Sequence, residues 1–144
     1  MDTVLKRISI TMNSLILVSH SHLITDGLKE MVSEMASDKE KLTIYSCGGT
    51  DDNRIGTDPT KILTAIEDSA NADYIYLIGD IGSGLMSIDM ALELVDDLEL
   101  KDKCHVINGP LVEGAFVIGV QTMIDPKPEA VNAQIDSVIE SFKE

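Results

Sequence analysis

The stretch Ser14 to Gly27, SLILVSHSHLITDG, decides the fold of this chain. Its apolar run Leu15 to Val18 has the composition of a buried parallel strand, and it leads through two histidines into a helical pattern. His20 therefore falls at the carboxyl end of a strand and just before a helix. In open α/β sheets ligands bind outside these strand ends, where the free amides of a helix N-terminus favour an anion. The segment predicts an anion site that contains a histidine. The helix after it is expected to bury one apolar face, formed by Leu23, Ile24, Leu28, Met31, Val32 and Met35.

Composition limits the function classes. The chain has 144 residues, 44% of them hydrophobic, which suits one domain with one core. Its net charge of -14 predicts neither nucleic-acid binding nor binding to an anionic membrane surface. No apolar run reaches the roughly 20 residues that span a bilayer, and the start of the chain lacks a secretory signal pattern, so we predict a cytoplasmic protein. Cys47 and Cys104 lie at or beside predicted strands, which favours reduced thiols over a disulfide or a metal pair.

The beginning of the chain stands apart from this pattern. Residues 1–11, MDTVLKRISIT, precede a second methionine, Met12, and a strand that is already complete without them. We expect residues 1–11 to be an amino-terminal extension outside the fold and residues 12–144 to form the domain.

Strands and helices alternate along the rest of the chain. Further strands are expected at Leu42 to Cys47, Asp73 to Gly79 and about Cys104 to Ile107. Helices are expected from Pro59, with Asp58 as its N-cap, and over about 83–98, 111–124 and 127–142. The helix over 83–98 should bury Leu85, Ile88, Leu92, Val95 and Leu98, and the last helix should bury Val131, Ile135, Val138 and Phe142. The helix over 111–124 is apolar almost all round and should face the core or another subunit.

This alternation predicts an α/β fold, a doubly wound three-layer domain with a mainly parallel central sheet. With the strand order 2-1-3-4, the carboxyl ends of strands one and three flank the binding crevice. Strand three is followed by Asp80, so we expect His20 and Asp80 to be neighbours.

The chemistry of this pair follows from the residue types. A neutral imidazole is a good nucleophile near neutral pH, and a nearby helix N-terminus disfavours its protonated form. A carboxylate that accepts a hydrogen bond from one ring nitrogen fixes the tautomer and leaves the other nitrogen to attack phosphorus. The residue types therefore allow His20 to be a phosphorylated nucleophile with Asp80 as the group that orients it; by its position alone, His20 is equally well a polar strand terminus without a function.

The remaining candidates would surround a phosphate. The hydroxyls of Ser19 and Ser21 and the backbone amides of residues 21–24 are predicted to bind it. His22 is a further phosphate-binding candidate, or else a solvent-facing residue of the first helical turn. A zinc site built from His20 and His22 is less well supported than a phosphate site. The further ligands that zinc would need, Cys47, Cys104 and His105, lack the close paired spacing of structural zinc sites. We predict no metal and no cofactor.

Two glycine-bearing loops, GGTDDNRIGTD at 48–58 and GDIGSG at 79–84, also follow predicted strands. Neither matches a P-loop or the dinucleotide fingerprint, so binding of ATP or NAD is not expected. Both loops are expected at the edge of the sheet where the crevice lies.

Four motifs carry a resemblance to a known family: VSHS at 18–21, IGTD at 55–58, the Asp80 turn with its continuation GSGLMS, and NGPLVEGA at 108–115. In their order and spacing the chain, over about residues 12–124, resembles the mannose-type IIA family of the phosphotransferase system. Within that family it is most similar to the phosphotransfer subunits of phosphoenolpyruvate-dependent dihydroxyacetone kinases. The resemblance implies that His20 is the phosphorylated residue and Asp80 its hydrogen-bond partner. The chain departs from the pattern of this family at His22 and in its amino-terminal extension.

The resemblance also implies partners. Such a subunit takes a phosphoryl group from phospho-HPr and passes it to ADP bound on DhaL, which regenerates ATP there for DhaK to use in the phosphorylation of glycerone (dihydroxyacetone). Members of the family form homodimers, and the apolar helix at 111–124 offers a surface for this.

Three other interpretations remain open. A sugar-specific IIA subunit would use the same histidine but would pass phosphate to a membrane-linked IIB acceptor; the segment NGPLVEGA favours the dihydroxyacetone system. A receiver domain needs an acidic pair after strand one, where this chain has Ser19 and His20. A flavodoxin-like electron carrier needs aromatic residues around its flavin, and this chain has no Trp, two Phe and three Tyr.

Overall fold

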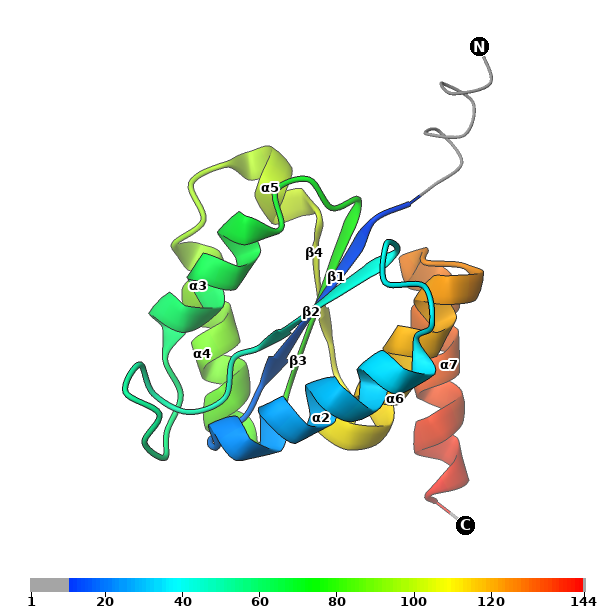
Figure 1. The fold of residues 1–144 in the computed structure, drawn as a ribbon, viewed down its shortest axis with the longest axis horizontal. Helices are drawn as coiled ribbons and strands as arrows, with labels where there is room; N and C mark the ends of the chain where they lie inside the picture. The colour runs from blue at the N-terminus through cyan, green and yellow to red at the C-terminus, as the bar shows by residue number, and fades with distance from the viewer. Residues whose placement is uncertain (1–10, 144) are drawn as a thin grey trace.

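The computed structural model describes residues 11–143, so the predicted extension at residues 1–11 lies almost entirely outside the described residues. Four strands form one parallel sheet in the order β2-β1-β3-β4 (Figure 1). The strands are β1 (Asn13–Val18), β2 (Leu42–Ser46), β3 (Tyr74–Gly79) and β4 (Cys104–Ile107). The strand order 2-1-3-4, which was assumed in placing His20 beside Asp80, is the order observed.

Helices cover both faces of the sheet. One layer contains α2 (His22–Met35), α6 (Leu111–Ile124) and α7 (Pro128–Ser141), and the other contains α3 (Pro59–Asp68), α4 (Gly82–Glu93) and α5 (Leu98–Asp102) (Figure 1). The predicted doubly wound three-layer α/β domain is therefore the observed architecture. No helix among the described residues 11–143 is long and apolar enough to cross a membrane.

The central strand β1 divides its side chains between two cores. Leu15 and Leu17 pack under α2 and α6, while Ile16 and Val18 pack under α3 and α4. All four side chains are fully buried, because alternate residues of a strand point to opposite faces and both faces are covered by helices. This explains why the strand reads as a continuous apolar run and not as an alternating one.

Local signals set the start of α3. The carboxylate of Asp58 accepts a hydrogen bond from the amide of Thr60 at 2.9 Å, and Pro59 occupies the first helical position. A cap of this kind satisfies an amide that has no partner inside the helix. The predicted N-cap is confirmed.

The predicted helix over 83–98 is wrong at its end. It stops at Glu93, and a separate helix, α5, begins at Leu98. The new helix begins at this point because the carboxylate of Asp97 accepts from the amides of Glu99 and Leu100 and so caps its first turn. Leu98, expected in the core, stands at the first position of α5 and is 74% exposed.

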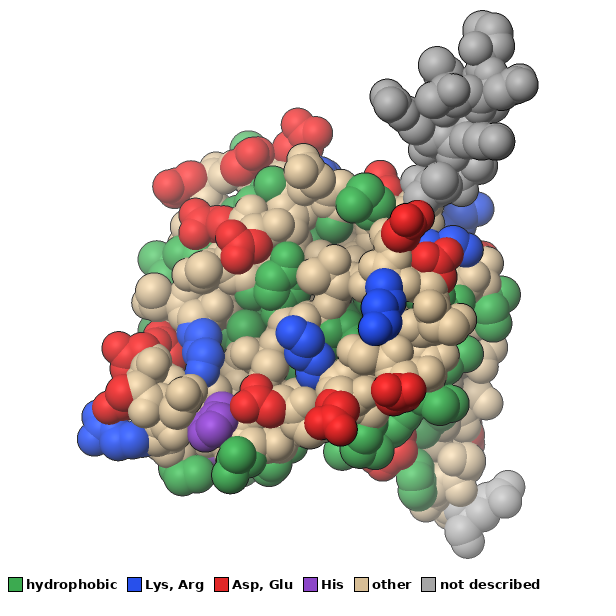
Figure 2. Space-filling model, viewed as in Figure 1, with side chains coloured by type: hydrophobic (Ala, Val, Ile, Leu, Met, Phe, Trp, Pro, Cys, Tyr) green, Lys and Arg blue, Asp and Glu red, His purple; other side chains and the backbone are tan. Residues whose placement is uncertain are grey.

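Two other helices bury narrower faces than expected. In α2 only Leu28 and Val32 of the six predicted apolar positions are buried, together with Thr25. The others are exposed: Leu23, Ile24, Met31 and Met35. In α7 Val131 and Ile135 are buried as predicted, but Phe142 follows the last turn and is exposed. Figure 2 shows charged side chains of both signs along α2 and hydrophobic side chains gathered at the edge of the molecule beneath it.

Candidate functional site

The candidate site lies where β1 and β3 end. These strands are paired in register up to Val18 and Gly79, so the residues that follow them, Ser19 to His20 and Asp80, leave the sheet at the same edge. The ring nitrogen Nδ1 of His20 lies 3.0 Å from both carboxylate oxygens of Asp80. The structure thus brings together the two residues to which the sequence assigned nucleophile and orienting group.

The Asp80 carboxylate is held from several sides. Its Oδ2 accepts from the backbone amide of His20 at 3.0 Å and from the hydroxyl of Ser19 at 2.9 Å, besides its contact with the His20 ring. Burial pushes the pKa of Asp80 up, but the hydrogen bonds from His20 and Ser19 outweigh this, and the pKa lies below its usual value. Asp80 is therefore ionised at neutral pH and acts as an acceptor for all of these donors.

A missing side chain makes room for this carboxylate. A Cβ added at Gly84, in the first turn of α4, would lie 2.6 Å from Oδ1 of Asp80. Any larger residue at this position would displace the carboxylate from the histidine. The second glycine of the motif GSGLMS, Gly84, is therefore explained by the space that the Asp80 carboxylate needs.

The loop between β2 and α3 packs against the same edge of the sheet. The amide of Gly49 donates to the carbonyl of Ser19 at 3.0 Å, and that of Gly56 donates to the carbonyl of His20 at 2.9 Å. Both glycines have positive φ, +76° and +142°, which only glycine adopts readily. The ammonium of Lys61, in α3, donates to the carbonyls of Gly48 and Thr50 and so ties the loop to this helix. The predicted loop at 48–58 is thus a support for the histidine backbone.

A cavity of about 410 Å³ opens beside Asp80. It is lined by Ser19, Ile24, Asp80, Ile81 and residues 109–113. These residues lie at the starts of three helices, α2, α4 and α6. Each helix N-terminus contributes a partial positive charge and amides without an intrahelical partner, which favour an anion, while the carboxylates of Asp80 and Glu113 in the same lining oppose one. The sequence reasoning considered only the first of these helices; the segment NGPLVEGA was a signal for the third, because it follows strand β4.

The other predicted phosphate ligands are placed differently. Ser19 is fully buried and its hydroxyl points to Asp80, so its geometry is that of a support for the carboxylate and not of a phosphate ligand. The backbone amide of Ser21, which was predicted to bind the phosphate, donates to the Ser19 hydroxyl at 3.3 Å. Ser21 is the N-cap of α2, and its side chain makes no capping hydrogen bond.

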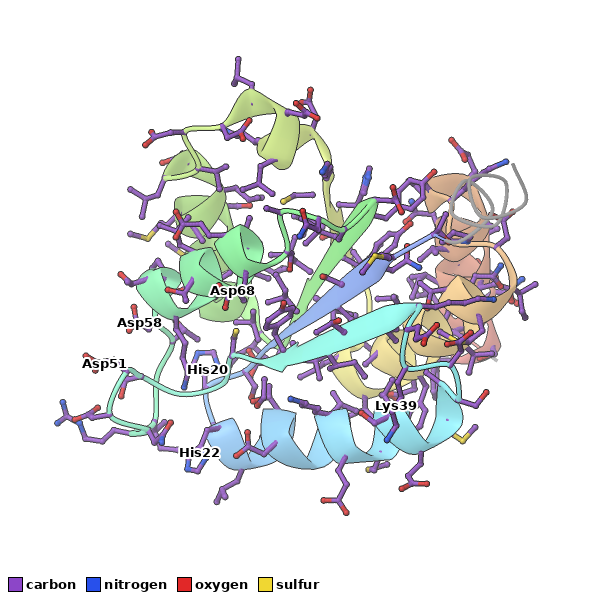
Figure 3. All side chains as sticks on the ribbon, turned by 45° about the horizontal axis from the view of Figure 1, so that its top comes forward. His20, His22, Lys39, Asp51, Asp58 and Asp68 are labelled. Carbon is purple, nitrogen blue, oxygen red and sulfur yellow. The ribbon has the colours of Figure 1, made fainter. Side chains whose placement is uncertain are left out.

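His22 belongs to a separate group of side chains. Its Nδ1 lies 3.1 Å from Oδ2 of Asp26, one turn further along α2. Both histidines lie at the carboxyl edge of the sheet, next to the loop that carries Asp51 (Figure 3). Sequence reasoning missed Asp26 as the partner of His22, although the spacing of four residues within a predicted helix was a usable signal.

Metal ligands do not gather at this edge. Within residues 11–143 no three His, Cys, Asp or Glu side chains are close enough to hold a metal ion together. Cys47 and Cys104 are both free thiols, and burial raises the pKa of each to about 11. The arrangement that remains is a histidine, a carboxylate and helix N-termini, which suits transfer of a phosphoryl group through the imidazole.

The fold and the site together define a doubly wound parallel α/β domain with a histidine–carboxylate pair at the carboxyl ends of its central strands. The sequence profile of EIIA-man, described as PTS system fructose IIA component, matches residues 14–132, and the chain belongs to this family.

Relatives within the family are DhaM subunits, which confirms the resemblance seen in the motifs. The chain is 45% identical over 127 residues to the phosphoryl donor subunit DhaM of phosphoenolpyruvate-dependent dihydroxyacetone kinase 2 from Listeria innocua, covering 88% of this chain and 99% of that protein. It is 39% identical over 131 residues to DhaM of Escherichia coli, covering 89% of this chain but 26% of that longer protein. Among solved structures, that of EF1359, a protein of unknown function, matches with a TM-score of 0.79 at 32% identity and covers 88% of this chain and 95% of that one.

Proposed function

We propose that this chain is a phosphohistidine carrier that accepts a phosphoryl group on His20 and passes it on for the phosphorylation of dihydroxyacetone. The observation that carries the proposal is the contact of His20 Nδ1 with the ionised carboxylate of Asp80 at 3.0 Å. The names of the relatives, phosphoryl donor subunits of dihydroxyacetone kinases, support the direction of transfer and the final acceptor.

The carboxylate selects the reacting nitrogen. An ionised Asp80 can only accept hydrogen bonds, so Nδ1 of a neutral His20 carries the ring proton and donates it to Asp80. The lone pair then resides on Nε2, on the other side of the ring. Nε2 is therefore the atom that we assign as the nucleophile.

The transfer step balances with this assignment. Nε2 of His20 attacks the phosphorus of a phosphohistidine on the donor, and the donor's P–N bond breaks with its electron pair passing to the donor imidazole. The donor imidazole leaves neutral and keeps its own ring proton. The phosphorylated His20 ring becomes positively charged, and the Asp80 carboxylate stabilises that charge through Nδ1–H. In the second step an oxygen of the acceptor attacks the phosphorus, and His20 returns to its neutral form.

The surroundings of the phosphoryl group would stabilise its oxygens. The three helix N-termini around the 410 Å³ cavity each contribute a partial positive charge, and we propose the Ser21 hydroxyl as an additional donor. The His22 ring, predicted from the sequence as a further phosphate-binding group, is not assigned as a donor here, because its Nδ1 faces Asp26. Ser19 contributes indirectly, since its hydroxyl holds Asp80 in place.

The donor and the acceptor complete the proposal. We assign phospho-HPr as the donor and ADP bound to DhaL as the acceptor, and the ATP regenerated there is used by DhaK. The similarity to DhaM subunits over nearly the whole length of the Listeria protein supports this choice. The second candidate, a sugar-specific IIA component with a IIB acceptor, is kept because the matching family profile is described as a fructose IIA component.

The test is a reconstituted transfer reaction. The chain is incubated with phosphoenolpyruvate, enzyme I and HPr, and acid-labile phosphate on the chain is measured; DhaL with ADP is then added and ATP is measured. We expect phosphate on the wild type, and we expect ATP formation to be at least tenfold slower in His20→Ala than in the wild type. The control His105→Gln, which removes a histidine of strand β4, should form ATP as the wild type does. A wild type that accepts no phosphate would refute the carrier function. Delivery to a IIB protein in place of DhaL would establish the second candidate.

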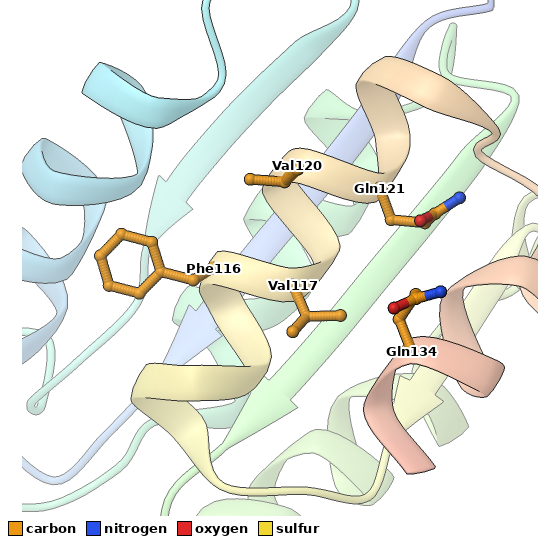
Figure 4. Close-up of a pocket in the computed structure, with 5 residues that line it drawn as sticks. All are labelled: Phe116, Val117, Val120, Gln121 and Gln134. Atoms are coloured by element: carbon orange, nitrogen blue, oxygen red, sulfur yellow. The ribbon is translucent and has the colours of Figure 1, made fainter. Parts of the chain in front are cut away.

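We also propose that the chain forms a homodimer through the outer face of α6. Val112 and Val120 are exposed on this helix, and Phe116 is partly exposed. A hollow of about 270 Å³ lies between α6 and α7, lined by Phe116, Val117, Val120, Gln121 and Gln134 (Figure 4). Burial of this apolar surface favours association, so Val120→Glu should convert a dimer into a monomer in sedimentation-velocity measurements. A wild type that sediments as a monomer at all concentrations would contradict the dimer.

A further inference from the structure

A second group in this chain repeats the pattern of the candidate site. At the first, a serine (Ser19) donates to a carboxylate (Asp80) that faces Nδ1 of a histidine. At the second, the hydroxyl of Ser46 donates to Oδ1 of Asp26 at 2.5 Å, and Oδ2 of Asp26 lies 3.1 Å from Nδ1 of His22. The two groups share the residue types, their order of contact and the ring nitrogen that faces the carboxylate.

The second group is more than a pair on a helix surface. His22 and Asp26 are one helical turn apart on α2, an arrangement that often occurs without function. Ser46, however, comes from the carboxyl end of β2 and so fixes Asp26 from another element. The Thr25 hydroxyl lies 2.7 Å from Ser46 Oγ and accepts from the amide of Gly48, which ties α2 to β2 at this point.

Asp26 resembles Asp80 in its ionisation as well, because the pKa of each carboxylate lies below its usual value. The hydrogen bonds from Ser46 and from His22 lower the pKa of Asp26. Asp26 is therefore ionised at neutral pH and orders the His22 ring with the proton on Nδ1. Nε2 of His22 then carries the lone pair, and it has no hydrogen-bond partner among the residues that the structure describes. The two imidazoles are similarly accessible, with 26% of the His20 side chain and 31% of the His22 side chain exposed.

From this repeated geometry we propose that His22 is a second phosphoryl acceptor, loaded on Nε2 by the same phosphohistidine donor that loads His20. The inference rests on the proposed function, because it needs a phosphohistidine donor that docks at this edge. The step has the same balance: the P–N bond of the donor breaks, the P–N bond to His22 forms, the donor imidazole leaves neutral, and the positive charge on His22 is stabilised by Asp26.

His22 should accept phosphate more slowly than His20. The Asp26 side chain is 57% exposed and that of Asp80 is 21% exposed, so water screens the charge of Asp26 more strongly. Asp26 also lacks the additional backbone donor that Asp80 has in the amide of His20. We expect loading of His22 to be about tenfold or more slower than loading of His20.

The test uses the full chain in the His20→Ala background, with phosphoenolpyruvate, enzyme I and HPr as the phosphoryl source and mass spectrometry under non-acidic conditions to locate the phosphate. We expect His20→Ala to accept phosphate on His22, the double variant His20→Ala/His22→Ala to accept none, and His20→Ala/Asp26→Asn to accept it at least tenfold more slowly than His20→Ala. The control His20→Ala/His105→Gln should be loaded as well as His20→Ala. Circular dichroism of each variant establishes that it is folded.

The outcomes separate the two proposals. If the wild type is loaded on His20 but folded His20→Ala accepts nothing, or if phosphate persists when His22 is also removed, the second acceptor is refuted and the carrier function stands. If the wild type accepts no phosphate, both are refuted.

Discussion

Asp80 binds His20 at two points: its carboxylate faces Nδ1 of the ring and also accepts from the backbone amide of the same residue, each at 3.0 Å. The residue next to it in the chain, Ser19, donates to the same carboxylate. One side chain from the end of β3 therefore fixes both the backbone and the imidazole at the end of β1. This arrangement makes Asp80 the residue on which the geometry of the site depends most.

Removal of the Asp80 carboxylate should slow phosphoryl transfer while the fold is kept. Asp80→Ala takes away the group that orients the ring and stabilises its charge after phosphorylation, so we expect a loss of about 10- to 10³-fold in the rate of transfer from phospho-HPr. Rapid-quench measurement of phosphate on the chain gives this rate. An unchanged rate in the folded variant would remove Asp80 from the mechanism.

The same carboxylate should contribute to stability in a pH-dependent way. Because the pKa of Asp80 is lower in the folded chain than in the unfolded chain, its contribution is fully present above the unfolded value of about 4 and is lost as the pH falls through the folded value. Urea unfolding of the wild type and of Asp80→Asn should give a difference in unfolding free energy at pH 7 that shrinks as the pH falls below about 4. A difference that grows with acidity would have the wrong sign for this account.

Gly84 should be required for the position of Asp80. The Cβ of Gly84→Ala would lie 2.6 Å from Oδ1 of Asp80, whereas a Cβ at Gly82, two residues earlier in α4, has nothing within 4 Å. We expect Gly84→Ala to slow phosphoryl acceptance by about tenfold or more and Gly82→Ala to leave it within twofold of the wild type. Equal rates for both variants would show that the carboxylate tolerates the displacement.

A second pair of glycine variants tests the packing of the loop on α2. A Cβ at Gly48 would clash with the carbonyl oxygen of Ser21 and with the Thr25 hydroxyl, but a Cβ at Gly27 in the middle of α2 meets nothing within 4 Å. Gly48→Ala should lower the unfolding free energy by about 2 kcal/mol through overpacking. Gly27→Ala should raise it by about 0.5–1 kcal/mol, because alanine favours a helix. Urea unfolding measures both, and a neutral Gly48→Ala would mean that the loop is not held here.

Much of the fold was predictable because each strand of a parallel sheet carries its own signal. The apolar run Leu15 to Val18 and the strand ending at Gly79 were identifiable from local composition, and the alternation of strands and helices limited the topology. The adjacency of His20 and Asp80 followed from strand order alone. The helix boundary near Leu98 was missed because Leu98 continues the helical spacing of the apolar residues before it. The side chain of Asp97 instead caps the backbone at this point and begins a new helix.

The parts of the site that were missed depend on contacts between distant segments. The contact of Ser46 with Asp26 joins β2 to α2, and the start of α6 lines the same cavity as Ser19 although the two lie far apart in the chain. Neither contact produces a periodic pattern in the sequence. The hydroxyl of Ser19 was assigned to the phosphate because the sequence does not reveal that this side chain is fully buried and directed at Asp80.

The most direct test of the central claim is to determine which atom carries the phosphoryl group. The wild type, labelled with ¹⁵N in its histidine rings, is phosphorylated with phosphoenolpyruvate, enzyme I and HPr and examined at early times by ¹⁵N and ³¹P NMR. We expect phosphate on Nε2 of His20, with Nδ1 protonated beside Asp80. Phosphate on Nδ1 of His20, or a loaded chain in which His20 carries none, would contradict it.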